Sequence, residues 1–272
     1  MIDGEFHGID YDESGDGSTV VLVPGSCSTG AAWRPVVAQL KTRFRCVTTS
    51  LLGYGGTVER RTALDADISY EAEVLEAVVL RTASPVHLVG HSFGGLSALA
   101  VALRRRVPLL SLTIIEAPAP EILPPMGEHG HYLAFRSMTD AYFSAFRSGD
   151  TAAINRMIDF YGGEGTFASW PQRVRDYAVQ TTPVNLLDWE SAYGFNLTPA
   201  LLATVEIPVL VMWGSASHPA AKRANELIGR CIPNAAVASV AGASHFMVST
   251  HVVEVAGLVA QHLARAESVT RS

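Results

Sequence analysis

The feature that most constrains the fold is the sequence Gly-His-Ser-Phe-Gly at residues 90–94. It lies between an apolar run at residues 86–89 and a helix-like run at residues 96–100. Glycines on both sides of a central serine allow a strand to turn sharply into a closely packed helix, because neither position carries a side chain. Such a turn holds the backbone of Ser92 in a strained conformation and projects its hydroxyl outward. Because Gly-x-Ser-x-Gly also occurs by chance, its meaning depends on the rest of the chain.

The rest of the chain alternates short β-branched runs with longer helix-like stretches. This alternation predicts parallel strands that are connected through helices. The predicted strands are residues 19–23, 45–49, 86–89, 112–115, 209–213 and 236–240. Functional groups of open parallel sheets gather at the carboxyl ends of the strands, so the residues after each run are the first candidates for chemistry.

Composition excludes several classes of protein. The chain has 272 residues, 48% of them hydrophobic, which is enough for one large core with an insertion. The net charge of −6 comes without a basic stripe, so nucleic acid is not an expected partner. Residues 1–5 are polar and lack a basic segment followed by an apolar one, so we expect no membrane anchor and a cytoplasmic location. The three cysteines show neither disulfide nor metal-ligand spacing.

Four strand ends carry small or reactive residues. The first strand is followed by Pro-Gly-Ser-Cys-Ser-Thr-Gly at residues 24–30, whose small side chains let backbone amides face a site. The third strand ends at Ser92, the fourth at Glu116, and the last leads to Gly-Ala-Ser-His-Phe, which contains His245. A serine, an acid and a histidine therefore follow one another in that order.

These motifs resemble those of the α/β-hydrolases. The loops at residues 24–30 and 52–56, the turn at residues 90–94 and the histidine loop all have counterparts in that family. The resemblance covers nearly the whole chain except its middle, and the serine turn is its most specific part. It implies a mostly parallel central sheet flanked by helices, with a helical cap as an insertion. We expect the core to comprise residues 1–120 and 204–272, and the cap residues 121–203.

The resemblance also implies roles for individual residues. Ser92 is the expected nucleophile, and His245 is the base that takes its proton and later returns it to the leaving group. The backbone amides of Phe93 and of Ser26 or Cys27 are the expected oxyanion-hole donors.

The acid departs from the commonest pattern. The family usually has an aspartate after the strand at residues 209–213, but the turn at residues 214–219 reads Gly-Ser-Ala-Ser-His-Pro. Some relatives, including haloalkane dehalogenases, carry the acid one strand earlier, where this chain has Glu116. We therefore predict that Glu116 orients His245. The alternative is that Glu116 is an ordinary exposed residue at the end of a strand.

The middle segment has apolar and aromatic residues at helical spacing. They either pack the cap onto the core or also line a pocket for a small apolar substrate. The candidate lining residues are Met126, Phe135, Tyr142, Phe146 and Trp189, together with Trp170 and Tyr193.

The predicted function is hydrolysis of a carboxylic ester, thioester or lactone through an acyl-enzyme on Ser92. Hydrolysis of a carbon–carbon bond and acyl transfer remain open on the same residues, and the missing aspartate leaves open a ligand-binding protein without chemistry. No cofactor is predicted, because no dinucleotide or phosphate loop is present. No metal is predicted, because His129 and His131 lack a third ligand nearby and read as a solvated loop. The sequence contains no indication of oligomeric state.

Overall fold

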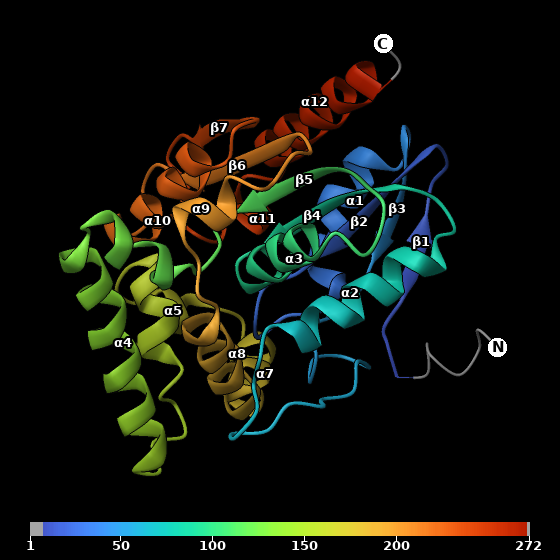
Figure 1. Cartoon of the computed structure of the whole chain (residues 1–272). Coiled ribbons are helices and arrows are strands. Elements are labelled where there is room, and N and C mark those ends of the chain that lie inside the picture. Colours follow the sequence, from blue (N-terminus) through green and yellow to red (C-terminus); the bar gives the residue numbers. More distant parts are fainter. Residues whose placement is uncertain (1–7, 271–272) are drawn as a thin grey trace.

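The computed structural model describes residues 8–270 and is built on a seven-stranded sheet with the order β1-β3-β2-β4-β5-β6-β7 (Figure 1). All neighbouring strands pair in parallel except β1 with β3. The strands are β1 (Asp12–Ser14), β2 (Ser18–Val23), β3 (Phe44–Thr48), β4 (Val86–His91), β5 (Leu109–Ile115), β6 (Val209–Gly214) and β7 (Ala235–Val240). The six predicted strands are confirmed with slightly different ends. Strand β1 was not predicted, because its three residues are polar and exposed and carry no alternating pattern.

Alternate residues of the strands face two separate hydrophobic cores. In β2, Val21 and Val23 belong to one core, and Val20 and Leu22 belong to the other. The first core packs against α2, α3 and α10, and the second against α1 and α12. The helices of this layered part are α1 (Arg34–Leu40), α2 (Ser69–Arg81), α3 (Phe93–Arg104), α10 (Pro219–Cys231), α11 (Met247–Thr250) and α12 (Val252–Thr270), with the 3-10 turn η1 (Gly30–Trp33) before α1. Burial on both faces explains why the central strands are apolar without interruption.

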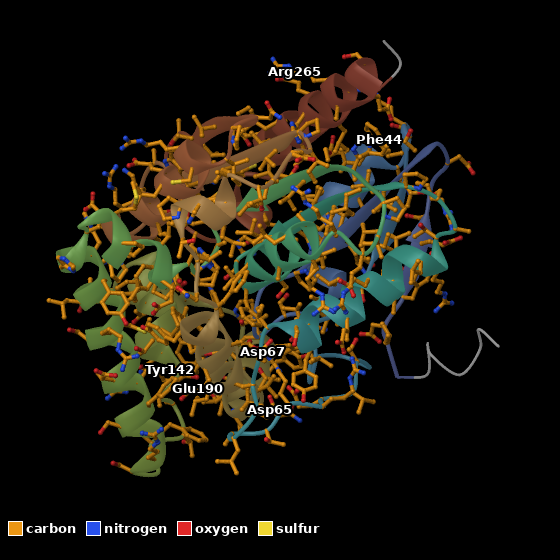
Figure 2. The ribbon with its side chains drawn as sticks, in the orientation of Figure 1. Phe44, Asp65, Asp67, Tyr142, Glu190 and Arg265 are labelled. Atoms are coloured by element: carbon orange, nitrogen blue, oxygen red, sulfur yellow. The ribbon has the colours of Figure 1, made fainter. Side chains whose placement is uncertain are left out.

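The chain between β5 and β6 contains helices and no strand among the described residues. Its elements are η2 (Pro120–Ile122), η3 (Pro124–Met126), α4 (His129–Arg147), α5 (Asn155–Gly162), α6 (Thr166–Ser169), α7 (Gln172–Gln180), α8 (Thr182–Gly194) and α9 (Pro199–Leu202). Figure 1 shows α4, α5, α7 and α8 grouped to one side of the sheet. Figure 2 shows Tyr142 and Glu190 within this group, with Asp65 and Asp67 of the loop before α2 beside it. The division into core and cap at residues 121 and 203 remains a prediction.

No helix within residues 8–270 is both long enough and apolar enough to span a membrane. Residues 1–5, on which the expectation of no anchor rests, lie outside the described part of the chain.

Two buried histidines, His87 of β4 and His262 of α12, make stability depend on pH. His262 is 7% exposed, and desolvation lowers its pKa from 6.5 to about 4. Desolvation also lowers the pKa of His87, which pairs through Nδ1 with Ser111 Oγ at 2.8 Å. Since the unfolded chain binds protons below about pH 6.5 and the folded chain does not, stability falls as the pH decreases from 6.5 towards 4.

We therefore expect the melting temperature to fall steadily between about pH 6.5 and pH 4. A shift of this size at His262 corresponds to about 3 kcal/mol. Thermal unfolding of His262→Gln across this range is expected to show a flatter slope than the wild type. His129→Gln, which changes an exposed histidine, serves as the control. Equal slopes for all three proteins would contradict this origin of the pH dependence.

Candidate active site

Ser92 occupies a sharp turn between β4 and α3, as the glycine pattern predicted. Its φ of 53° lies in the left-handed region, which is strained for a residue with a side chain. The glycines permit this turn: a Cβ on Gly90 would lie 2.2 Å from the carbonyl oxygen of Gly94, and one on Gly94 would lie 2.2 Å from that of Pro24. The Ser92 N–H donates to Ile115 O at 2.8 Å, so β5 holds the turn from the neighbouring strand. The Ser92 side chain is thereby presented at the carboxyl edge of the sheet.

His245 connects Ser92 to Glu116. Its Nε2 lies 2.9 Å from Ser92 Oγ, and its Nδ1 lies 2.9 Å from Glu116 Oε1. The three residues come from the ends of β4 and β5 and from the loop after β7, which meet because parallel strands end at one edge. The arrangement is that of a nucleophile, a base and an orienting acid.

Glu116 is fully buried, so its interpretation as an exposed strand-end residue is wrong. Its second oxygen, Oε2, accepts from the N–H of Gly214 at 3.0 Å and from Ser217 Oγ at 2.5 Å. Both donors belong to the turn at residues 214–219, where the aspartate was expected. The turn that lacks the acid therefore supplies the hydrogen bonds that hold the substitute acid. In the same turn, the His218 side chain accepts from Ala220 N at the start of α10, and its ring stacks on Phe160 at 3.9 Å.

Replacing Ser217 by alanine is expected to lower kcat about tenfold. The change removes a short hydrogen bond to the buried Glu116 side chain, a contact that contributes about 1.5–3 kcal/mol, while leaving the Gly214 contact in place. Steady-state kinetics of Ser217→Ala beside Ser239→Ala, which alters an exposed serine of β7, measures the effect. An unchanged kcat in Ser217→Ala would show that Glu116 does not depend on this donor.

The loop at residues 24–27, here called the oxyanion loop, packs directly against Ser92. A Cβ on Gly25 would lie 2.7 Å from the Cβ of Ser92, so this approach requires glycine. Within the described residues, the N–H groups of Phe93 and Ser26 have no hydrogen-bond acceptor, whereas the N–H of Cys27 donates to the Tyr54 hydroxyl. Of the two candidates in this loop, Ser26 is therefore the one whose amide is free to receive an oxyanion. Burial raises the pKa of the Cys27 thiol to about 12, which excludes it as a nucleophile at neutral pH.

His91 and Tyr161 hold His245, one at its backbone and the other at its imidazole. His91 Nε2 contacts the His245 carbonyl oxygen at 2.9 Å, and the Tyr161 ring of α5 stacks on the imidazole at 4.1 Å between centroids. Desolvation, and then the neighbouring His245, lower the pKa of His91 to about 3. His91 is therefore neutral at physiological pH, and it supports the backbone of His245 without adding a charge beside it.

Comparison with known proteins places the chain in a family. The family model described as "Alpha/beta hydrolase family" matches residues 20–258, nearly the whole chain. The chain belongs to the alpha/beta hydrolase family.

Relatives and solved structures agree with this assignment. The chain is 25% identical to a cis-3-alkyl-4-alkyloxetan-2-one decarboxylase of Xanthomonas campestris pv. campestris, covering 86% of the chain and 84% of the relative. It is 34% identical to a pimeloyl-(acyl-carrier protein) methyl ester esterase of Aliivibrio salmonicida, covering 34% of the chain and 33% of the relative. A hydrolase from Oleispira antarctica has a TM-score of 0.80 at 16% identity, with 97% of both chains covered. An esterase from Thermogutta terrifontis, with malate bound, has a TM-score of 0.76 at 21% identity, covering 95% of this chain and 93% of the esterase. The predicted α/β-hydrolase fold is confirmed, and the chain is an enzyme of the hydrolase class.

The aromatic residues of the helical segment lie at different distances from Ser92, His245 and Glu116. Phe135 and Trp189 both contact Tyr161, which stacks on His245. Trp170 contacts Phe246, the neighbour of His245. Tyr142 is buried between α4 and α8, where its hydroxyl donates to Asn185. Met126 and Phe146 are half-buried at the edge of the same core, and their role in binding remains a prediction.

The two histidines considered as metal ligands belong to a helix and not to a solvated loop. His129 and His131 form the first turn of α4, and His131 pairs with Glu128 at 3.0 Å. Across residues 8–270 there is no group of three His, Cys, Asp or Glu side chains placed to hold a metal ion. That the reaction needs no metal and no cofactor remains a prediction.

Sequence reasoning missed a group of buried charges behind the oxyanion loop, here called the buried charge cluster. It consists of the buried residues Arg61, Glu71 and Asp188 and the half-buried Glu59. Arg61 lies 2.8 Å from Glu59, 3.3 Å from Glu71 and 2.9 Å from Asp188. Burial raises the pKa of Glu71 to about 8 against the opposing charge of Arg61. The available signal was a carboxylate, Asp188, between the apolar residues Leu186, Leu187 and Trp189 of α8.

Proposed function

We propose that this hydrolase cleaves a carboxylic ester, including a thioester or a lactone, through an acyl-enzyme on Ser92. The observation that supports the proposal best is the continuous hydrogen-bonded series Ser92–His245–Glu116, in which both contacts measure 2.9 Å. These distances lie within the range that proton transfer between nucleophile and base requires.

Acylation begins when Ser92 Oγ attacks the ester carbonyl carbon. The hydroxyl proton moves to His245 Nε2, while the N–H at Nδ1 donates to Glu116 Oε1 and the carboxylate stabilises the imidazolium. The carbonyl oxygen becomes an oxyanion and accepts from the N–H groups of Phe93 and Ser26. The tetrahedral intermediate then collapses, and His245 gives the proton to the leaving oxygen or sulfur, which departs as an alcohol or a thiol.

Deacylation repeats these steps with water. His245 takes a proton from water, the resulting hydroxide attacks the acyl carbon, and the same two amides stabilise the second oxyanion. Collapse releases the carboxylic acid and returns the proton to Ser92. In a lactone, the acid and the leaving alkoxide belong to one product, a hydroxy acid.

We propose that the substrate is small and apolar and that residues 121–203 cover it as a helical cap. The aromatic group around His245, formed by Phe135, Tyr161 and Trp189, supports an apolar acyl or alcohol group. The names of two relatives refer to an alkyl-substituted four-membered lactone and to a methyl ester. Both are carboxylic esters, one cyclic and one open, and both belong in a first substrate panel.

Hydrolysis of a carbon–carbon bond and acyl transfer use the same serine and base as ester hydrolysis. The first differs from it in the group that leaves, and the second in the group that attacks the acyl-enzyme. A ligand-binding protein without chemistry is disfavoured by the buried acid at Glu116, because two hydrogen bonds to Oε2 leave Oε1 directed toward His245. The substrate panel therefore includes a vinylogous diketone and an alcohol acceptor as well as esters.

The test is covalent labelling of the wild-type protein with a fluorophosphonate, followed by intact mass and peptide mapping. We expect one label per chain on the peptide that contains Ser92, with release of fluoride, and no label on heat-denatured protein. Labelling of the folded protein at another residue, or none, would contradict an activated Ser92. Turnover of the panel then separates ester hydrolysis from the other reactions of the same site.

A further inference from the structure

We propose that Asp188 is a positioning residue for the oxyanion hole: it fixes the oxyanion loop through the Ser26 hydroxyl and through Tyr54, and thereby connects that loop to α8. This inference rests on the proposed function, because it assigns the loop an oxyanion to bind. Neither the triad nor the sequence motifs include Asp188.

Two short hydrogen bonds meet at one oxygen of this carboxylate. Ser26 Oγ donates to Asp188 Oδ2 at 2.6 Å, and the Tyr54 hydroxyl donates to the same oxygen at 2.6 Å. Both distances lie at the short end of the range for a hydroxyl donating to an ionised acceptor. Asp188 is 2% exposed and Tyr54 is fully buried, so water does not compete for the Tyr54 contact, whereas the Ser26 contact is half-buried.

Tyr54 extends the contact to the other end of the oxyanion loop. The N–H of Cys27 donates to the Tyr54 hydroxyl, whose own proton goes to Asp188. The loop is thus held at Ser26 by a side chain and at Cys27 by its backbone. Cys27 has a φ of 56°, a conformation that costs free energy for a non-glycine residue and that surrounding contacts must maintain. Both contacts lead to Asp188.

Within the buried charge cluster, Arg61 fixes the second carboxylate oxygen of Asp188. Arg61 Nη1 lies 2.9 Å from Asp188 Oδ1, the oxygen that does not bind the loop. The side chain of Arg61 is fully buried and is also paired with Glu59 and Glu71. Each carboxylate oxygen of Asp188 therefore has its own partners, and the carboxylate cannot rotate without losing an ion pair inside the protein.

The position of the oxyanion loop matters because the loop lies against the nucleophile. Gly25 approaches Ser92 so closely that even a methyl group on Gly25 would collide with the serine. The Ser26 N–H, one residue further, must point to where the oxyanion forms, and an error of about 1 Å in such a donor can cost about a hundredfold in rate. Asp188 sets this position from α8, which belongs to the helical segment between β5 and β6.

The test compares Ser26→Ala and Asp188→Asn with the wild type, using two inhibitors of matched shape. A trifluoromethyl ketone forms a bond between its carbonyl carbon and Ser92 Oγ, transfers the serine proton to His245 and leaves an oxyanion in the hole. The corresponding methyl ketone remains trigonal. Because Ser26→Ala keeps the backbone N–H, any loss of affinity for the first inhibitor alone reports the position of that N–H.

We expect kcat for an ester to fall about 10- to 100-fold in both variants, with KM changed less than about threefold. The affinity for the trifluoromethyl ketone should fall by the same factor as kcat, and that for the methyl ketone should not. Ser26→Thr, which restores the hydroxyl, should recover most of the loss. The matched control is Ser191→Ala, which removes a buried hydroxyl contact of the same helix with the carbonyl of Ala66 and does not touch the oxyanion loop.

The outcomes separate this inference from the proposed function. A wild type that binds both ketones equally would show that Ser92 forms no tetrahedral adduct, and the proposed function fails. A wild type that prefers the trifluoromethyl ketone, with the preference unchanged in Ser26→Ala, would overturn the positioning role alone. A lower melting temperature without a change in this preference would assign the contacts to stability only. If Asp188→Asn does not fold, Ser26→Ala and Ser26→Thr decide the question.

Discussion

Replacing Ser92 by alanine is expected to lower kcat for the best ester about 10⁵- to 10⁶-fold. The reason is that no acyl-enzyme can form without Oγ, and only the oxyanion donors and substrate binding then remain to accelerate the direct attack of water. The fold should persist, because the change removes only the Oγ atom of Ser92 and its hydrogen bond with His245. Steady-state kinetics with an assay sensitive enough for the residual rate measures the effect.

The variant His245→Ala and the double variant Ser92→Ala/His245→Ala test this prediction further. Since Ser92 and His245 act in the same proton transfer, the double variant should be no slower than either single variant by more than a few fold. Ser148→Ala, which changes an exposed serine after α4, is the control and should keep wild-type kinetics. Losses that add in the double variant would indicate that the two residues work in separate steps. Substantial activity in Ser92→Ala would rule out the serine mechanism.

Replacing Glu116 by glutamine is expected to lower kcat about 10⁴-fold at neutral pH. Glutamine has nearly the same shape, but its amide cannot stabilise an imidazolium and favours the wrong tautomer of His245. The buried position also makes the charge effective, because the site has little solvent to screen it. Kinetics at several pH values measures the loss together with any recovery at high pH.

The control for this change is Glu206→Gln, an exposed acid just before β6. It should retain wild-type kcat, since it lies outside the hydrogen-bonded group around His245. Thermal unfolding of both variants separates a loss of catalysis from a loss of folded protein. If Glu116→Gln keeps most of its activity while remaining folded, Glu116 is not the third member of the triad.

A local sequence pattern identifies a residue when the role of that residue depends on its neighbours in the chain. Ser92 stands out because the two glycines and the flanking strand and helix lie within a few positions of it. Glu116 was predicted from its place at a strand end where some related hydrolases carry the acid, and that reasoning also left open an exposed residue. Burial and the donors from the turn at residues 214–219 distinguish the two interpretations, and a sequence pattern reports neither.

The sequence by itself determined the alternation of strands and helices, the sharp turn at Ser92 and the order of serine, acid and histidine. These follow from the spacing of apolar residues and from glycines that permit close contact, which are properties of short stretches of chain. Only the tertiary structure decided which groups meet. His245 and Glu116 are 129 positions apart, and Ser26 and Asp188 are 162 apart. The first contact depends on parallel strands that end at one edge of the sheet, and the second depends on how the helices between β5 and β6 pack back onto the sheet. Asp188, Tyr54 and Arg61 became recognisable only once that packing had brought them together.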